Sequence, residues 1–232
     1  MIFTPNNAPA VVLLFLGTVL VVGIGVTSGA WLAYRKRFVA ARRIGEALAV
    51  VLLIYGGTLL AHSFTSSDRS LEPGQLKYFC EIDCHLAYSV ESVREVSSLP
   101  GPPAVHAKGR FLIVSVKTWF DPNTISPHRG NGELYPNPRA IELEDSAGVR
   151  HRPSVEAEKA AVPGSDPREP LARPLRPGES YTTDLVFDLP AAAHATRLLI
   201  TENLAVAPFI VSHENSLFHG KTWFRLPTPG NS

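Results

Sequence analysis

The chain has 232 residues, of which 45% are hydrophobic and 19% charged, and its formal net charge is +1. The length exceeds one average domain, and the near-balance of charges excludes a strongly basic or strongly acidic protein. These averages combine two unlike parts, because residues 1–34 contain no charged side chain and the remainder contains all of them.

The first predicted element is the uncharged, mainly apolar stretch Ala8–Tyr34. A helix needs about 20 apolar residues to cross the hydrocarbon core of a bilayer, so this stretch predicts a membrane span. A secretory signal peptide would carry positive charge before a shorter apolar core, whereas here the basic residues come only afterwards. We therefore expect an anchor that is not cleaved.

A second apolar run, Ile44–His62, follows a short basic segment. The basic residues of that segment are Arg35, Lys36, Arg37, Arg42 and Arg43. Two spans joined in this way predict a transmembrane helical hairpin over residues 1–62. Because Lys and Arg near span ends stay on the cytoplasmic side, both termini are expected on the outer side of the cytoplasmic (inner) membrane.

Two features inside the spans leave alternatives open. Glu46 lies one turn from the basic segment, where pairing with Arg42 or Arg43 is favoured over a role as a proton or ion carrier. Gly25 and Gly29 form a G-x-x-x-G pattern. That pattern is consistent with close packing of the two helices and also with a homo-oligomer formed through them.

After a polar linker at residues 63–75, the pattern of residues 76–232 changes to a period of two. Apolar residues alternate in RFLIVSVKTWF (110–120) and SYTTDLVFDLP (180–190), and shorter strands are expected at 140–143, 197–201 and 222–226. The first of these segments is apolar on both faces, as in a central strand. Short strands separated by Pro/Gly turns, with no convincing helix, predict one extracytoplasmic antiparallel β-sandwich.

Four segments in this region occur in a recognisable order: GRFLIVSVKTWF, AIELEDSAGVRHRP, LRPGESYTTDLVFDLP and TRLLIT. Over about residues 108 to 202 the chain resembles the immunoglobulin-like domain of membrane-anchored bacterial proteins of the DUF4352 kind. The matching residues are Asp145, Gly148, Pro177, Gly178, Phe187, Asp188 and Pro190. The resemblance implies an immunoglobulin-like sandwich and an exterior location, and it implies no activity.

The only two cysteines, Cys80 and Cys84, lie in KYFCEIDCHLAYSV. From Leu76 to Val90 every even position is apolar, which predicts one strand with both thiols on the same face. At roughly 3.3 Å per residue the two Cα atoms would be about 13 Å apart. A disulfide needs Cα atoms within roughly 7 Å, so the first interpretation is a pair of reduced thiols in the core.

A second interpretation of the same segment is a metal site. The C-x3-C spacing is similar to the copper loops of cytochrome oxidase subunit II and of the SCO copper chaperones. The resemblance implies copper bound by Cys80 and Cys84, with His85 or a distant His213 or His219 completing the set. Two soft thiolates and an imidazole are ligands that suit copper.

Both family patterns also differ from this chain, and the SCO motif does so by having Pro at the position of His85. The oxidase loop has a His where Tyr88 stands and a later Met ligand, whereas the only Met here is Met1. A third interpretation is a c-type haem electron carrier, because C-x-x-x-C-H resembles a longer variant of the haem-attachment motif, with His85 as the axial ligand.

No hydrolase or nucleotide-binding motif occurs in the sequence, and we expect no catalytic residues. The basic residues cluster at the membrane surface without an aromatic-basic stripe, so nucleic acid is not an expected partner. We expect a non-enzymatic accessory or assembly protein, with copper bound through the Cys-x3-Cys-His segment as one interpretation of its thiols. The alternative is a purely structural or protein-interaction sandwich with core cysteines. Expected partners are the lipid bilayer and a respiratory or other membrane complex.

Overall fold

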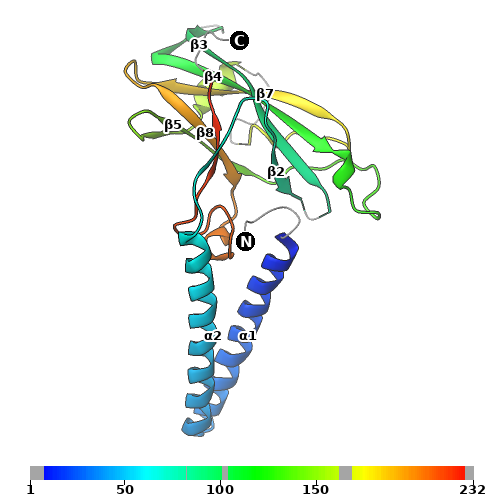
Figure 1. Cartoon of the computed structure of the whole chain (residues 1–232), viewed down its shortest axis with the longest axis vertical. Coiled ribbons are helices and arrows are strands. Elements are labelled where there is room, and N and C mark those ends of the chain that lie inside the picture. Colours follow the sequence, from blue (N-terminus) through cyan, green and yellow to red (C-terminus); the bar gives the residue numbers. More distant parts are fainter. Residues whose placement is uncertain (1–7, 82, 101–103, 162–168, 228–232) are drawn as a thin grey trace. The chain divides into compact units, whose positions relative to one another are not determined.

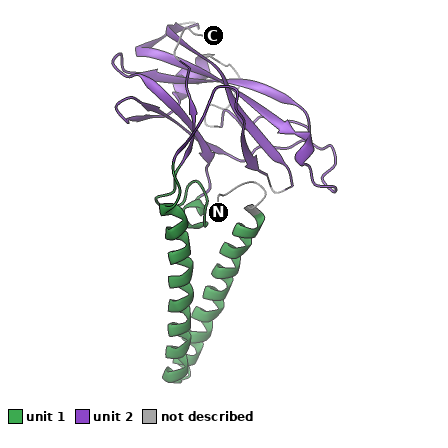
Figure 2. Cartoon of the chain, viewed as in Figure 1, with its two compact units in different colours: residues 1–67, 205–220 green, residues 68–204, 221–232 purple. Residues whose placement is uncertain are grey.

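The computed structural model of this protein describes residues 8–81, 83–100, 104–161 and 169–227 (Figure 1). Contacts within the chain separate it into two compact units (Figure 2). The helical unit comprises residues 1–67 and 205–220, and the β unit comprises residues 68–204 and 221–232. The helical unit therefore includes a segment, Ala205–Gly220, that lies far along the chain from the helices.

Two helices of 27 residues each dominate the helical unit: α1 (Ala8–Tyr34) and α2 (Phe38–Phe64). At 1.5 Å per residue each is about 40 Å long. Both are long and apolar enough to cross a membrane, by length and composition. The helix α2 includes the basic residues Arg42 and Arg43, and Arg42 pairs with Glu46 at 2.8 Å, one of the two pairings that the sequence predicted.

Two glycines of α1, Gly25 and Gly29, lie against α2. A Cβ atom added at Gly25 would come within 2.6 Å of the Leu48 side chain, and one at Gly29 within 3.7 Å of Ile44. Gly25 and Gly29 thus let the two helices approach each other within one chain, which supports the packing interpretation of the G-x-x-x-G pattern.

The β unit contains nine strands in two sheets within its described residues. The five-stranded sheet has the order β1 (Arg69–Leu71), β9 (Thr222–Arg225), β8 (Ala195–Glu202), β5 (Arg139–Asp145), β6 (Arg150–His151). The four-stranded sheet has the order β2 (Lys77–Cys80), β3 (His85–Leu99), β4 (Val105–Asp121), β7 (Ser180–Leu189). Strand β1 pairs in parallel with β9, and the other strand pairs are antiparallel.

The main core lies between the apolar faces of the two sheets, which makes the β unit a sandwich. Leu112, Val114 and Phe187 of one sheet share this core with Leu198 and Phe224 of the other. The predicted strands at 110–120, 140–143, 180–190, 197–201 and 222–226 are confirmed as parts of β4, β5, β7, β8 and β9.

The strand β4 is central and apolar on both faces, as its sequence predicted. Its second face is covered by a short helix, α3 (Val155–Ala161), which the sequence analysis missed. Ala157 of α3 packs with Phe111 and Ile113 of β4 and with Val186 of β7 in a smaller apolar cluster.

The single strand predicted over Leu76–Val90 is wrong. The chain turns back on itself between Cys80 and His85, and β2 and β3 form an antiparallel hairpin in which those two residues are paired. The predicted separation of about 13 Å fails with it, and so does the shared face, because Cys80 lies directly opposite His85 while Cys84 is buried in the core cluster with Phe79 and Leu86.

Candidate functional site

The β2–β3 turn holds the cysteine segment and is fixed by backbone hydrogen bonds. The N–H of Glu81 donates to the carbonyl of Cys84 at 2.8 Å, and the N–H of Asp83 donates to the carbonyl of Glu81 at 2.8 Å. The turn is also tied to the segment that follows β4, since the N–H of Ser126 donates to the carbonyl of Asp83 at 2.8 Å. Ile82 lies outside the described residues.

Cys84 is a core residue. It is 2% exposed and belongs to the same apolar cluster as Phe79 and Leu86. Burial raises the pKa of its thiol to about 11, with Asp83 adding to the rise and the neighbouring guanidinium of Arg129 opposing it. The core interpretation is confirmed for this cysteine, whose sulfur is a protonated thiol at neutral pH.

Cys80 lies in a different environment, at the half-buried end of β2. It is paired with His85 at the start of β3, and His85 is paired in turn with Asp121 at the end of β4. Directly opposite residues on antiparallel strands share a face, so a thiol, an imidazole and a carboxylate form one row across three strands. Neither cysteine forms a disulfide.

The surroundings of His85 favour the neutral form of its imidazole. Burial lowers its pKa, and the negative charge of Asp121 opposes that effect. The carboxylate of Asp121 accepts hydrogen bonds from the backbone N–H of Asn123 at 2.9 Å and from its side-chain amide at 3.1 Å. A neutral imidazole can accept a proton or bind a metal ion, and Cys80 supplies a thiol in the same row.

The two distal candidates belong to the helical unit. His213 is 3% exposed, and its Nδ1 accepts a hydrogen bond of 2.9 Å from the N–H of Asn215. Nδ1 of His219 lies 2.7 Å from the carbonyl oxygen of Gly220. Across the described ranges, no three His, Cys, Asp or Glu side chains are grouped so that they could hold a metal ion.

The sequence analysis missed a buried ion pair beside this hairpin. Arg139, at the start of β5, donates to Glu81 in the β2–β3 turn, and the two side chains are 1% and 2% exposed. Asn137 donates a second hydrogen bond to Glu81, and Nε of Arg139 donates to the hydroxyl of Tyr88 at 3.2 Å. Burial raises the pKa of Glu81, while the charge of Arg139 opposes that rise.

Aromatic rings and a second cation extend this network. The Arg139 guanidinium lies 4.4 Å from the centroid of the Phe79 ring, and the ammonium of Lys77 lies 5.3 Å from it. Lys77 also donates to the carbonyls of Ile200 and Thr222 at 2.7 and 2.9 Å, so it connects the two sheets. The sequence carries no local signal for this network, because Lys77 and Glu81 lie at odd positions that the alternation assigns to the polar face.

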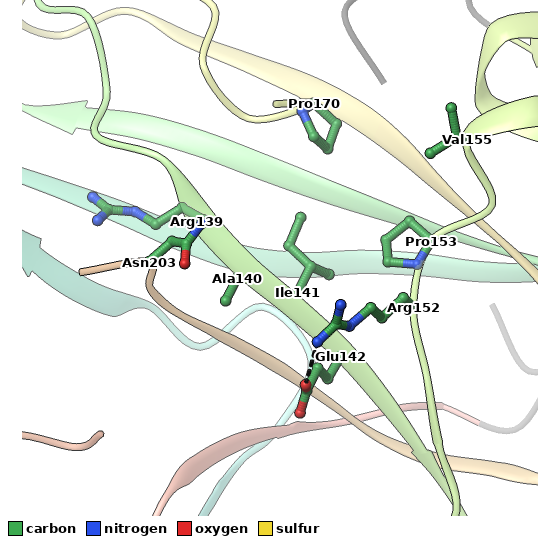
Figure 3. A pocket seen from close by; sticks show the side chains of 9 residues that line it. All are labelled: Arg139, Ala140, Ile141, Glu142, Arg152, Pro153, Val155, Pro170 and Asn203. Carbon is green, nitrogen blue, oxygen red and sulfur yellow. Dashed lines mark ion pairs between the residues drawn. The ribbon is translucent and has the colours of Figure 1, made fainter. Parts of the chain in front are cut away.

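A groove of about 350 Å³ lies along the first half of β5 (Figure 3). It is lined by Arg139, Ala140, Ile141, Glu142, Arg152, Pro153, Val155, Pro170 and Asn203. Strand β6 pairs only with Leu143 and Glu144, so in the described part of the chain the preceding residues of β5 have no strand on this side. Arg152 reaches Glu142 at 4.0 Å across the groove.

The lining side chains give this groove apolar contacts, the guanidinium of Arg152, one carboxylate and one amide, since the Arg139 guanidinium is buried against Glu81. They include no thiol, hydroxyl or imidazole that could act as a nucleophile or as the base beside one. Such a surface is suited to holding an extended segment by hydrogen bonds and apolar contacts.

No family model matches the chain, and no curated protein matches it. A secreted protein from Mycobacterium tuberculosis, MPT63, has a similar solved structure, with 14% identity and a TM-score of 0.41. The match covers 60% of this chain and 94% of that one. A conserved hypothetical protein from Bacillus anthracis matches with 12% identity and a TM-score of 0.36, over 55% of this chain and 87% of its own. Both TM-scores are below 0.5, so these likenesses say nothing about the function of this chain.

Proposed function

We propose that this protein is a membrane-anchored, non-enzymatic accessory protein whose β unit is an extracytoplasmic binding module of the immunoglobulin-like kind. The observation that carries the proposal is the surface of α1 and α2. Large apolar side chains are exposed along both helices, among them Leu13 at 68%, Leu20 at 63%, Leu53 at 74% and Ile54 at 65%. In water such a surface would aggregate, whereas in a bilayer it is the surface that contacts lipid.

The orientation follows from the connection between the helices. Arg35, Lys36 and Arg37 lie there together, and the Arg35 guanidinium is 5.6 Å from the centroid of the Trp31 ring. Basic residues mark the cytoplasmic end of a span, and Trp is enriched at membrane interfaces. We therefore place this connection at the cytoplasmic face and the β unit on the other side.

The groove along β5 is the proposed binding surface. It fits an extended segment of a partner, and a respiratory or other membrane complex is the class of partner that an inner-membrane anchor would bring within reach. A strand added beside Ala140 and Ile141 would gain backbone hydrogen bonds, while Arg152 and Asn203 would select its side chains.

Two measurements on the full chain test the anchor and its orientation. The protein should stay with the membrane pellet after extraction at alkaline pH, and a periplasmic reporter enzyme fused after Ser232 should be active. A reporter fused within the Arg35–Arg37 connection is the matched control and should be inactive. Release at alkaline pH would contradict the anchor, and activity of the control fusion in place of the first would contradict the orientation.

A second candidate function is copper binding, which the cross-strand pair of Cys80 and His85 favours. A thiolate and a neutral imidazole on one face are suitable copper ligands. Cys84 would have to lose a proton from a thiol whose pKa is about 11, so in this structure it is the weaker candidate of the two thiols. Covalent haem would need both sulfurs to be accessible, and Cys84 is buried.

Metal analysis of the purified full chain, grown with and without added copper, tests this candidate. Copper that is lost in both Cys80→Ser and His85→Ala but retained in Cys84→Ala would support a site on the Cys80 row. Equal copper in all four proteins would exclude it, and visible haem absorption that disappears in Cys84→Ala would favour the haem carrier instead.

A further inference from the structure

The loop Ala205–Gly220, which connects β8 to β9, belongs to the helical unit (Figure 2). Ile210 and Val211 share an apolar cluster with Val11 of α1 and Leu59 of α2. The hydroxyl of Tyr55 in α2 donates to the carbonyl of Phe209 at 2.7 Å.

The second half of the loop is held in the same way. The Phe218 ring stacks on Phe64 at the end of α2, with centroids 5.5 Å apart and planes 15° apart. The N–H of Gly220 donates to the hydroxyl of Ser66 at 2.7 Å. The loop is therefore attached to the end of the helical hairpin at two places, Phe209–Val211 and Phe218–Gly220.

Besides the buried Ile210 and Val211, six side chains of this loop are placed in the reverse of the arrangement that water favours. The polar side chains Ser212, His213 and Ser216 are 2%, 3% and 3% exposed. The apolar side chains of Phe209, Leu217 and Phe218 are 56%, 51% and 71% exposed. A loop facing water places its polar groups outward, because burying them without partners costs free energy and exposing apolar surface gains none.

The loop also satisfies many of its polar groups from within. The N–H groups of Ile210, His213 and Ser216 donate to the carbonyls of Ala207, Ile210 and His213, at 3.1, 3.2 and 2.8 Å. The Ser216 hydroxyl donates to the carbonyl of Ile210. Non-helical backbone at membrane depth is tolerated only where its hydrogen bonds are made within the protein.

The position of the loop along the helices matches the edge of a bilayer. About 20 helical residues span the hydrocarbon core, so counting back from Tyr34 in α1 and forward from Ile44 in α2 brings the opposite boundary near Leu14 and near Ser63. The loop contacts Val11 just beyond that boundary, and Tyr55 and Leu59 just inside it.

We infer that the loop Ala205–Gly220 inserts into the extracytoplasmic leaflet of the bilayer and forms a third membrane-contacting element of the chain. Its exposed apolar side chains continue the lipid-facing surface of α1 and α2, and its partner is the headgroup and upper acyl-chain region of the lipid. The inference rests on the proposed membrane anchor. It ties a segment between two sandwich strands to the membrane in addition to the direct connection that follows α2.

Tryptophan fluorescence of the full chain in phosphatidylcholine vesicles tests this inference. Phe218→Trp and Phe209→Trp each place an indole in the loop, and Tyr135→Trp is a control in the β unit, because Tyr135 is 70% exposed and Phe218 is 71% exposed. The fluorescence that an indole at position 218 or 209 adds should be blue-shifted, quenched by lipids brominated near the headgroup and little affected by aqueous iodide. The fluorescence that an indole at position 135 adds should be quenched by iodide and little affected by the brominated lipids, without a blue shift.

Native Trp31 separates failure of this inference from failure of the anchor. Trp31 is in α1 and 59% exposed, so brominated lipid should quench part of the wild-type emission, and this quenching should be lost in Trp31→Phe. If Trp31 is quenched but the indoles at 218 and 209 behave like the one at 135, the loop faces water and the inference is overturned while the anchor remains. If Trp31 is not quenched, the anchor itself is wrong. Circular dichroism that matches the wild type would exclude misfolding as the cause.

Discussion

Charged pairs occur in both units of the molecule, but the two units place them in opposite environments. In the helical unit Arg42 and Glu46 pair on a helix surface, with side chains 82% and 59% exposed. In the β unit Arg139 and Glu81 pair inside the sandwich, with side chains 1% and 2% exposed. The difference teaches that the geometry of an ion pair says little about its energetic role until the surrounding medium is known.

The largest expected effect comes from breaking the buried pair. Glu81→Ala leaves the Arg139 guanidinium charged and without its carboxylate in the core, which should lower the free energy of unfolding by about 3–5 kcal/mol. Glu46→Ala is the matched control and should cost no more than about 0.5 kcal/mol. Denaturant unfolding of the full chain in detergent, followed by tryptophan fluorescence, measures both.

The double variant Glu81→Met with Arg139→Met sharpens this test. It removes both charges and keeps the volume apolar, so it should recover most of the stability lost in Glu81→Ala. Equal losses for Glu81→Ala and Glu46→Ala would contradict the contrast between the two units.

Glu158 is an exception within the β unit, because it is a buried acid that pairs with no cation in the part of the chain that the structure describes. It lies in α3 at 2% exposure, and among the described residues neither carboxylate oxygen has a hydrogen-bond partner. Burial raises its pKa from 4.5 to about 7, while the nearby backbone of Val186 opposes the rise. The folded protein therefore binds this proton more tightly than the unfolded chain does.

This exception predicts a pH dependence of stability. Protonated Glu158 makes its full contribution to the free energy of unfolding below pH 4.5. This contribution is lost as the pH rises from 4.5 to about 7. The loss amounts to about 3 kcal/mol, since one pKa unit corresponds to about 1.4 kcal/mol. Unfolding curves of the wild type and of Glu158→Gln across this range should diverge as the pH rises, with the variant flatter. Parallel curves would show that Glu158 is not buried as an acid.

Glycine contacts distinguish the rigid backbone of the sandwich from the flexible side chains between the helices. A Cβ atom at Gly109 in β4 would lie 2.5 Å from both the N atom of Ala191 and the carbonyl oxygen of Leu189. Gly109→Ala should therefore cost about 1–3 kcal/mol, because backbone atoms would have to move. Gly25→Ala meets only the end of Leu48, and the gain in helix propensity of about 1 kcal/mol offsets that contact.

Thermal unfolding of the two alanine variants beside the wild type measures this difference. A larger loss for Gly25→Ala than for Gly109→Ala would mean that the helix–helix contact is the more rigid of the two.

Periodicity in the sequence predicted the helices and most of the sandwich because burial acts on each residue locally. The uncharged run of Ala8–Tyr34 indicates a helix that is apolar on all sides, and the alternation in 110–120 and 180–190 indicates which side chains face the core. The helix α3 also had a local signal, since VEAEKAA consists mostly of strong helix formers and Ser154 precedes it, its hydroxyl accepting from the N–H of Ala157 at 3.3 Å.

The rest of the site depends on contacts between residues that are far apart in sequence. The turn between Cys80 and His85 contains neither Gly nor Pro, and apolar alternation continues on both sides of it, so the reversal leaves no mark on the pattern. The pair of Arg139 with Glu81 and the attachment of the loop Ala205–Gly220 to the helices arise only after the chain has folded.

The two cysteines give the smallest predicted effect and compare an inside position with a half-exposed one within the same hairpin. Cys84→Ala removes a sulfur that is 2% exposed, and it should lower the free energy of unfolding by about 1 kcal/mol or somewhat more through lost burial and a small cavity. Cys84→Ser should cost more, because the hydroxyl would be buried in an apolar cluster. Cys80→Ala should change stability by less than Cys84→Ala, since Cys80 is only partly buried.

A thiol reagent measures the same contrast between Cys80 and Cys84 kinetically on the native full chain. The thiol of Cys80 should react readily, and this fast reaction should be absent in Cys80→Ala. The thiol of Cys84 should react only after denaturation, because its raised pKa, about 11, leaves almost no thiolate at neutral pH. Two sulfurs that react at the same fast rate would show that the turn between β2 and β3 opens readily, and the assignment of Cys84 to the core would then be wrong.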